Sequence, residues 1–231
     1  MDPGLPRFRK IAGKLLVLAG LALLSYPFLT DVWTAVAQES MAREWAQTVS
    51  TGEGSAEAPG PGAARLVAAS INLGKAARVG KGPRRGAVAR LIIPRIGLDV
   101  FLVEGTSRRA LRRGPGHMPG TPLPGEKGNS VISGHRVTYS RPFYRLDEMK
   151  PGDPIFVETP KGRFEYRVSG SEIVRPHEVR VLKPTPGATL TLTTCHPRFS
   201  AKRRLVVKAT MVGTASMPAA ELEQSLRKSL P

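Results

Sequence analysis

Residues 190–207 read LTLTTCHPRFSAKRRLVV and contain the only cysteine of this 231-residue chain. Leu190 and Leu192 alternate with threonines, which is the pattern of a strand that buries one face. In an extended strand Cys195 lies on the face opposite the two leucines, away from the predicted core. If the loop HPRFSAK joins antiparallel neighbours, Arg204 begins the second strand opposite Cys195. The stretch therefore predicts two paired strands that bring a thiol and a guanidinium together.

Short apolar and β-branched runs, separated by Gly, Pro and Asp, continue from Ala87 to Val212. Such a series is typical of many short strands, and few segments show helical spacing. Seven or eight strands with a short helix between the early ones favour a closed barrel, which leaves no free edge. We therefore predict a mainly β fold. The expected strands cover residues 87–93, 98–104, 129–133, 154–159, 162–174, 189–194 and 203–212, and the expected helical segments cover 106–113, 141–149 and 176–179.

The N-terminal segment has the character of a membrane anchor. Basic residues up to Lys14 precede a strongly apolar run over residues 15–29. Because basic residues hold their end of a helix in the cytoplasm, we expect a single-pass protein of the cell membrane with its folded domain extracytoplasmic. The alternative is a cleaved signal peptide, since AVAQ at residues 35–38 has the pattern of a cleavage site. That site lies far beyond the apolar core, which favours an uncleaved anchor.

The composition after the anchor changes twice. Residues 32–49 keep helical spacing, and the Gly- and Pro-rich stretch STGEGSAEAPGPGAA then breaks it. A stalk of this kind would hold the folded domain away from the membrane surface. The predicted parts are a basic cytoplasmic tail (1–10), a transmembrane signal anchor (11–30), a helical and flexible stalk and linker (31–86), the β-barrel (87–214) and a C-terminal tail (215–231).

The charge and the cysteine content limit the partners. The chain has 35 Lys and Arg against 18 Asp and Glu, a formal net charge of +17, which favours anionic partners. Because an extracytoplasmic domain rarely meets a genome, we expect lipid headgroups or wall polymers and no nucleic acid. A single cysteine excludes an intramolecular disulfide framework and a multi-cysteine zinc cage. No acidic cluster suggests a calcium site, so we expect neither a metal nor a cofactor.

Four histidines are available to act as a general acid or base beside the cysteine. His135 follows the predicted strand at residues 129–133 and so lies at a strand end. His117 lies among glycines and prolines, His177 lies in a predicted loop, and His196 directly follows the cysteine. A lone histidine or a lone cysteine is more often structural than catalytic. Composition and spacing alone therefore leave the choice of histidine open.

Four motifs occur in order along residues 89–212: GPGHMPGTPLPGEKGN, SGHRVTYSRPF, LDEMKPGDPIFVET and LTLTTCHPRFSAKRRLVV. Together they resemble the sortases, a family of membrane-anchored cysteine transpeptidases. The last two motifs, and TTCHPRFS above all, are most similar to class E, the housekeeping branch of high-GC Gram-positive bacteria. The resemblance implies an eight-stranded sortase β-barrel with short helices behind an N-terminal transmembrane helix. It also implies that His135, Cys195 and Arg204 form the catalytic set.

The same resemblance implies a reaction. A thiolate at Cys195 attacks the threonine carbonyl of a C-terminal LPxTG- or LAxTG-like sorting signal and forms a thioester. His135 protonates the departing glycine nitrogen and later accepts a proton from the incoming amine. Arg204 donates to the oxyanion or to the substrate backbone, and its charge favours the thiolate. The expected partners are secreted proteins that carry the signal and a cell-wall amine on the lipid-linked peptidoglycan precursor.

Two further residues are expected at the substrate. Thr194 resembles a family threonine that helps to orient the arginine and the substrate, although ordinary strand packing also accounts for it. Met118 stands where class E members often carry tyrosine, a residue that bears on the choice of alanine over proline at the second signal position. Both an LPxTG-like and an LAxTG-like sorting signal therefore stay possible. No aspartate-aromatic lid motif precedes the barrel, which favours housekeeping anchoring over pilus assembly.

Two other functions fit parts of the sequence. An L,D-transpeptidase is also a β-rich wall enzyme with a cysteine and a histidine, but its SHGC-like motif differs from TTCHP. A non-catalytic basic module that binds the cell wall or lipid would keep Cys195 buried and unreactive. Thiol labelling of the folded domain distinguishes this module from an enzyme.

Overall fold

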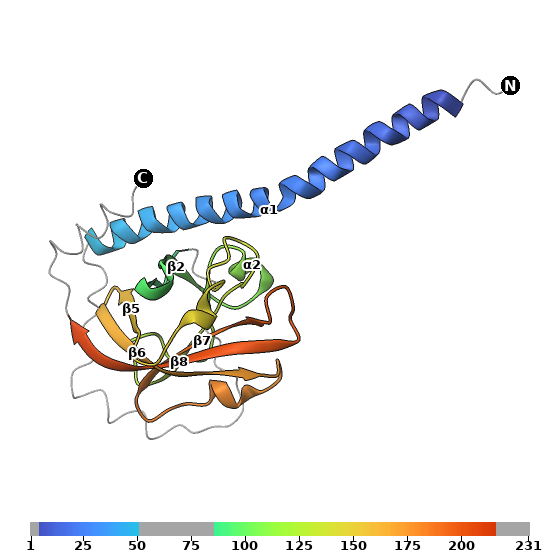
Figure 1. Cartoon of the computed structure of the whole chain (residues 1–231). Coiled ribbons are helices and arrows are strands. Elements are labelled where there is room, and N and C mark those ends of the chain that lie inside the picture. The colour runs from blue at the N-terminus through green and yellow to red at the C-terminus, as the bar shows by residue number, and fades with distance from the viewer. Residues whose placement is uncertain (1–4, 51–85, 216–231) are drawn as a thin grey trace, which may run out of the picture.

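A computed structural model describes residues 5–50 and 86–215 of the chain (Figure 1). The flexible linker expected before the barrel and the C-terminal tail expected after it lie outside these residues, except at their ends. The elements in chain order are α1 (Leu5–Ser50), β1 (Ala89–Ile93), the short 3-10 helix η3 (Pro94–Ile96), β2 (Leu98–Glu104), α2 (Arg108–Leu111), β3 (Gly116–His117), β4 (Gly128–Ser133), η4 (Leu146–Glu148), β5 (Pro154–Thr159), β6 (Gly162–Val174), η5 (Val179–Leu182), β7 (Ala188–His196) and β8 (Arg203–Ala215).

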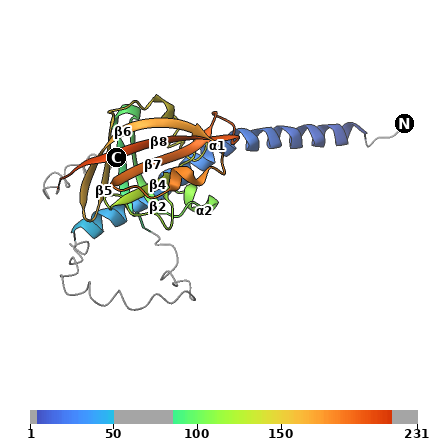
Figure 2. The ribbon, with the colours of Figure 1, turned by 90° about the horizontal axis from the view of Figure 1, so that it is seen from below.

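The eight strands form a closed barrel in the order β1-β2-β3-β4-β7-β8-β6-β5, which confirms the predicted fold class. Figure 2 shows the strands curving around one interior. The long antiparallel pairs come from neighbouring runs of alternating residues, as in β5–β6 and β7–β8. Closure by β5 on β1 leaves the sheet without a long open edge.

The strand that the sequence analysis did not predict is β3, two residues within the Gly- and Pro-rich GPGHMPG stretch. It is too short to show alternation, yet it joins β2 to β4 and so completes the barrel. Gly116 is required there because a Cβ atom at this position would collide with the carbonyl oxygen of Gly105. The close approach of two backbones, rather than side-chain pattern, therefore defines this strand.

The barrel interior is filled by the alternating apolar residues of the strands, including Leu190 and Leu192, both fully buried. The opposite face of β7 is not simply open to solvent, because Thr191 is also fully buried. The Thr191 hydroxyl donates to Asn129 Oδ1 at 2.7 Å, and Asn129 Nδ2 donates to the Val181 carbonyl at 2.9 Å. The segment that contains η5 thus covers part of this outer face.

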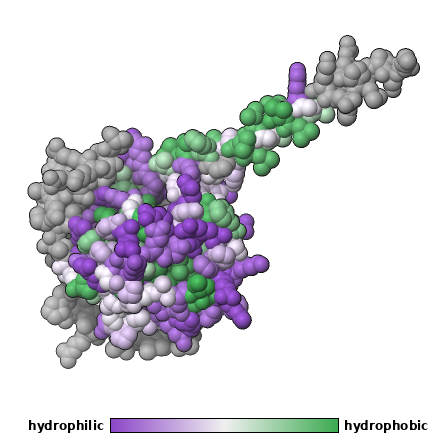
Figure 3. Space-filling model, in the orientation of Figure 1, coloured by the Kyte–Doolittle hydropathy of each residue, from purple (hydrophilic) through white to green (hydrophobic). Residues whose placement is uncertain are grey.

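The helix α1 is a single helix, and its first half matches the predicted anchor. It is long and apolar enough to cross a membrane, and its most apolar window is fully exposed. Figure 3 shows this exposed apolar surface on the part of α1 that extends beyond the barrel. An N-terminal apolar helix of this kind is consistent with membrane anchoring.

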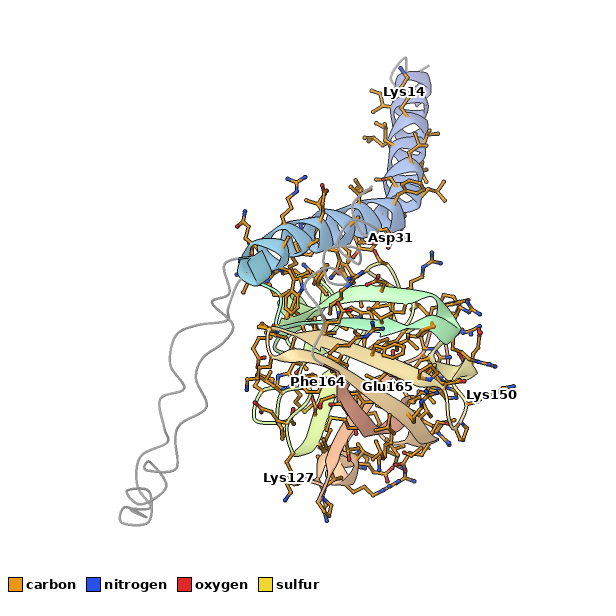
Figure 4. The ribbon with its side chains drawn as sticks, turned by 90° about the vertical axis from the view of Figure 1, so that its left-hand side faces the viewer. Lys14, Asp31, Lys127, Lys150, Phe164 and Glu165 are labelled. Atoms are coloured by element: carbon orange, nitrogen blue, oxygen red, sulfur yellow. The ribbon has the colours of Figure 1, made fainter. Side chains whose placement is uncertain are left out.

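The second half of α1 packs against the barrel (Figures 1 and 4). Met41 and Trp45 are buried against Phe101 and Val103 of β2. Gln38 binds the backbone of Phe101 on both sides, with its Oε1 accepting from the Phe101 N–H at 2.7 Å and its Nε2 donating to the Phe101 carbonyl at 3.1 Å. The helical part of the expected stalk is therefore seated on the domain instead of standing apart from it.

This docking bears on the alternative of a cleaved signal peptide. The candidate cleavage pattern at residues 35–38 lies inside continuous helix, and Gln38 at its end is bound to β2. In the folded chain this pattern is therefore part of the helix that packs on the barrel.

Substitution of Gln38 by alanine should loosen α1 from the barrel. The change removes the two bonds to Phe101 and a third from Gln38 Nε2 to the Arg113 carbonyl, 2.8 Å long. It leaves buried backbone groups of β2 without partners, so we expect a loss of about 1–3 kcal/mol in the free energy of unfolding. Denaturant unfolding of the full chain in detergent measures it. Ser40→Ala, an exposed change two residues on, should have little effect, and equal losses in the two variants would contradict the assignment.

Candidate active site

The site forms where two parallel strands end together. In the β4–β7 pair Ser133 lies opposite Thr193. His135 and Cys195 each follow two residues later, so both leave the same end of the barrel on neighbouring strands. The Gly134 N–H donates to the Thr193 carbonyl at 3.1 Å, which continues the ladder one step beyond β4. Strand register therefore brings the histidine and the cysteine together.

Thr194 adds a second link between these strand ends. Its hydroxyl donates to the Gly134 carbonyl at 2.8 Å, and the residue is 3% exposed. The side chain therefore points into the protein toward the turn that carries His135. This contact is more specific than ordinary strand packing. It ties Thr194 to the turn before His135, and the expected role of Thr194 toward the substrate stays a prediction.

The predicted pairing of the cysteine with an arginine is observed. Cys195 of β7 lies directly opposite Arg204 of β8, whereas Arg203 lies opposite His196. Cys195 is half-buried and is a free cysteine. Arg204 Nη1 donates to the carbonyl oxygens of Ala201 at 3.0 Å and Arg203 at 3.1 Å, which fixes the guanidinium beside its own loop. The strand phase thus distinguishes the two neighbouring arginines.

Two of the other histidines, His117 and His196, have polar partners within the fold, and His177 is exposed. His117 is 2% exposed, and its Nδ1 lies 2.9 Å from Glu104 Oε2 while its Nε2 lies 3.0 Å from the Pro122 carbonyl. His177 lies exposed in a loop. His196 Nδ1 lies 3.2 Å from Arg136 Nη1. Among the four histidines, His135 is the one that follows β4 at the cysteine end of the barrel.

The surroundings of His135 lower its pKa. Partial burial is the main cause, because it disfavours the charged imidazolium, and the positive charge of Arg112 adds to the effect. The ring lies against Tyr139, with 5.1 Å between the ring centroids. The Phe143 N–H donates to the His135 carbonyl at 3.1 Å, and a Cβ on Gly134 would meet the Phe143 ring at 2.6 Å. Backbone and packing therefore hold this histidine in place.

The loop after His135 adopts an unusual backbone and is held by α1. Tyr139, Ser140 and Arg141 have φ angles of 52°, 58° and 49°, in the left-handed region that non-glycine residues avoid. Such residues persist where the surrounding structure holds them. The Ser140 N–H donates to Asp31 Oδ1 at 2.7 Å. The helix that leaves the predicted membrane segment therefore supports the loop that packs on the histidine.

Arg136 is a site residue that the sequence analysis missed. It is 2% exposed, and its Nη1 donates to the Cys195 carbonyl at 3.3 Å. Its Nη2 pairs with Asp147 Oδ2 at 2.9 Å. The motif SGHR names this arginine, but charge alone predicts a solvated side chain, and only the fold shows that it is buried behind the cysteine. Arg136 thus ties the backbone of Cys195 to the segment that follows His135.

Met118 directly follows β3 and lies next to β4. Its N–H donates to the Val131 carbonyl of β4 at 2.8 Å, and its own carbonyl accepts from the Thr121 hydroxyl at 2.7 Å. The side chain is partly exposed. Its backbone is thus fixed next to β4, while its role toward a signal remains a prediction. Within residues 5–50 and 86–215, no group of three or more His, Cys, Asp or Glu is placed to hold a metal ion.

Removal of the Thr194 hydroxyl should destabilise the strand ends. Thr194→Val keeps the shape but leaves the Gly134 carbonyl without its side-chain donor, so we expect a loss of about 1–3 kcal/mol in the free energy of unfolding. Thr194→Ser retains the hydroxyl and should recover most of it. Denaturant unfolding of the full chain compares the variants. Equal stability of the serine and valine variants would show that the bond contributes nothing.

Neutralising Arg112 should raise the pKa of His135. The positive charge of Arg112 disfavours the imidazolium, so Arg112→Gln removes this repulsion and leaves the effect of burial. Titration of the imidazole by NMR, assigned with His135→Gln, measures the change. Arg109→Gln is the matched control on the same helix and should leave this pKa where it is. A pKa that stays constant or falls in the Arg112 variant would contradict the proposed coupling.

The sequence also matches curated relatives. Sortase SrtE1 of Streptomyces coelicolor is 38% identical over 140 residues, which cover 54% of this chain and 40% of the relative. Sortase D of Bacillus subtilis is 32% identical over 117 residues, which cover 50% of this chain and 58% of the relative. The match therefore spans less than two thirds of the length of either relative.

Solved structures show the same barrel. Sortase E1 from Streptomyces coelicolor, determined with a tripeptide in the active site, has 35% identity and a TM-score of 0.53, covering 55% of this chain and 89% of that one. The Clostridium perfringens Sortase D5 transpeptidase has 31% identity and a TM-score of 0.52, covering 56% of this chain and 81% of that one. The sortase-domain family model matches residues 91–212, more than half of the chain. With its closed barrel, this protein belongs to the sortase family.

Proposed function

We propose that the protein is a membrane-anchored cysteine transpeptidase, with His135, Cys195 and Arg204 as its catalytic residues. The observation that carries the proposal is the meeting of three strand ends. The register of β4 with β7 brings the histidine to the cysteine, and the register of β7 with β8 brings the arginine. The proposed substrate is a secreted protein with a C-terminal LPxTG- or LAxTG-like sorting signal.

In the first half of the proposed reaction the Cys195 thiolate adds to the threonine carbonyl of the signal. The carbonyl electrons move onto the oxygen, which accepts a hydrogen bond from Arg204. Collapse of this intermediate breaks the bond to the glycine nitrogen, which takes a proton from the His135 imidazolium. Because the pKa of His135 is lowered, its imidazolium is a stronger acid but a smaller fraction at neutral pH. The products are a thioester and the released C-terminal peptide.

In the second half an amine attacks the thioester. Neutral His135, the form that its lowered pKa favours, accepts the proton of the amine as the new amide bond forms. The Cys195 sulfur then leaves as thiolate, so the enzyme returns to its starting state. The proposed acceptor is a cell-wall amine on the lipid-linked peptidoglycan precursor, which joins the secreted protein to the wall.

The proposed location is the cell membrane, with a single crossing by α1 and the barrel outside. The apolar exposed first half of α1 and the basic residues before it support this topology. The high net positive charge of the chain suits an anionic surface at that location. Family membership removes the alternative of an L,D-transpeptidase. A non-catalytic module that binds wall or lipid is the remaining alternative, and it needs an unreactive cysteine.

Cleavage of a signal peptide tests the proposal. The full chain in detergent should release the C-terminal part of a quenched fluorescent peptide that carries LAxTG or LPxTG, and Cys195→Ala should abolish release. Arg204→Ala should lower kcat/KM by about 100-fold or more, because an oxyanion donor is removed. Cleavage of one peptide over the other also reports the preference that Met118 leaves open.

The neighbouring arginine provides a matched control. Arg203→Ala removes the same charge from the same strand, but Arg203 lies opposite His196 and not opposite the cysteine. It should retain most of the activity. Equal losses in the two arginine variants would contradict the assignment of Arg204. Unchanged release by Cys195→Ala would contradict the proposed chemistry, and failure of Cys195 to react with a thiol probe would favour the binding module.

A further inference from the structure

The part of α1 that lies on the barrel has two different faces. The face toward the barrel carries Thr34, Gln38 and Met41. Gln38 and Met41 contact β2, and the Thr34 hydroxyl donates to the Arg112 carbonyl at 3.1 Å. The other face, just after the predicted membrane segment, is apolar and exposed. Its residues are Val32 (54% exposed), Trp33 (48%) and Val36 (62%). Nothing in the described residues covers these side chains.

The shape of α1 places these residues where the predicted membrane segment meets the barrel. The helix changes direction near Asp31, and the second part lies across the barrel while the first part extends away from it (Figure 4). If the first part crosses the bilayer, the start of the second part lies at the membrane–water interface. Tryptophan is enriched at membrane–water interfaces, where its ring is apolar and its N–H stays wet. Trp33 follows the predicted membrane segment at the position that suits such a role.

A basic segment lies at the same level of α1, on its barrel side. The segment around α2 is bound to α1 through the carbonyls of Arg112 and Arg113, which accept from Thr34 and Gln38. Arg108, Arg109 and Arg112 are exposed on this segment. Arginines held near a bilayer are attracted to anionic headgroups, each by an amount comparable to thermal energy or somewhat more. Apolar side chains flanked by arginines are the composition of a surface that lies in a membrane interface.

We infer that Val32, Trp33 and Val36 of α1, together with Arg108, Arg109 and Arg112 in and after α2, lie at one level of the molecule and together bind the anionic headgroups of the outer leaflet. The inference rests on the proposed membrane anchoring of α1. It adds that the end of the domain next to α2 is held at the bilayer and not merely tethered to it.

The surface lies next to the active site. Arg112 stacks over Tyr139, with its guanidinium carbon 5.6 Å from the ring centroid, and Tyr139 lies 5.1 Å from the His135 ring. Asp31 binds the same loop through Ser140. The histidine therefore lies only a few side chains from the proposed lipid surface. A lipid-linked acceptor amine would reach the site without leaving the membrane interface.

Fluorescence of Trp33 tests the apolar part of the surface. The chain has two tryptophans, and Trp45→Phe leaves Trp33 alone. Trp45 Nε1 is buried without a hydrogen-bond partner, so this change removes packing but no hydrogen bond. The full chain in lipid nanodiscs should show quenching of Trp33 by lipids brominated near the headgroup, and weaker quenching by lipids brominated near the chain ends. Quenching by aqueous acrylamide alone would overturn the inference.

A fluorescent label on α2 tests the basic part. In a Cys195→Ala background, a bimane label at Arg109→Cys should be quenched by lipids that carry a headgroup nitroxide when the disc contains phosphatidylglycerol. A label at Lys127→Cys is the matched control, because Lys127 is exposed at the end of the barrel away from α1 (Figure 4). Quenching at Arg109 should fall by about twofold or more in phosphatidylcholine, in high salt, or when Arg108 and Arg112 are changed to Gln.

These readouts separate the inference from the anchoring on which it rests. Resistance of the chain to alkaline extraction from the bilayer reports insertion of α1 independently. A chain that does not insert contradicts the proposed anchoring. A chain that inserts but shows equal quenching at Arg109 and Lys127, or no dependence on anionic lipid, contradicts the headgroup surface alone.

Discussion

The parallel pairing of β4 with β7 is the constraint on which the rest of the site depends. These strands are far apart in the sequence, so their pairing requires long chain connections to be closed before any contact stabilises them. The Thr194 hydroxyl then fixes the step beyond the last paired residues. A slip of this register by one residue would turn the cysteine to the opposite face and move it from the histidine. Position along the strands, more than loop conformation, places the histidine and the cysteine at the same end of the barrel.

The parts of the fold that follow from local pattern were predictable, and those that depend on backbone proximity were not. Alternation in residues 190–207 predicted two antiparallel strands and the pairing of Cys195 with Arg204, as observed. The strand β3 was not predicted, because two residues are too few to show alternation. The contacts of Asp31 and Arg136 were not predicted either. They depend on burial and on contacts between distant segments, which a charged residue in the sequence does not reveal. The choice of His135 came from family resemblance, since four histidines were open.

Charge is used in two different ways in this molecule. Within the domain, Arg136 is buried with four partners: Asp147, the Tyr144 carbonyl, the Cys195 carbonyl and the His196 ring. Satisfied in this way, a buried guanidinium favours one arrangement of the segments it joins, because any other arrangement leaves it without partners. On the surface around α2, arginines lie exposed in water, where their interactions are weaker and are screened by salt beyond about 10 Å. The first kind of charge holds the site together, and the second acts on what approaches it.

The seating of α1 on β2 has a consequence for the segment that follows it. Residues 51–85 join the end of α1 to the start of the barrel, and a linker in that place would ordinarily set how far a domain stands from its anchor. Here the distance is already fixed by the contacts of Gln38, Met41 and Trp45. The linker instead keeps the two surfaces at high effective concentration, an effect that changes slowly with length. Changes in the length or sequence of this segment should therefore leave the position of α1 on the barrel the same.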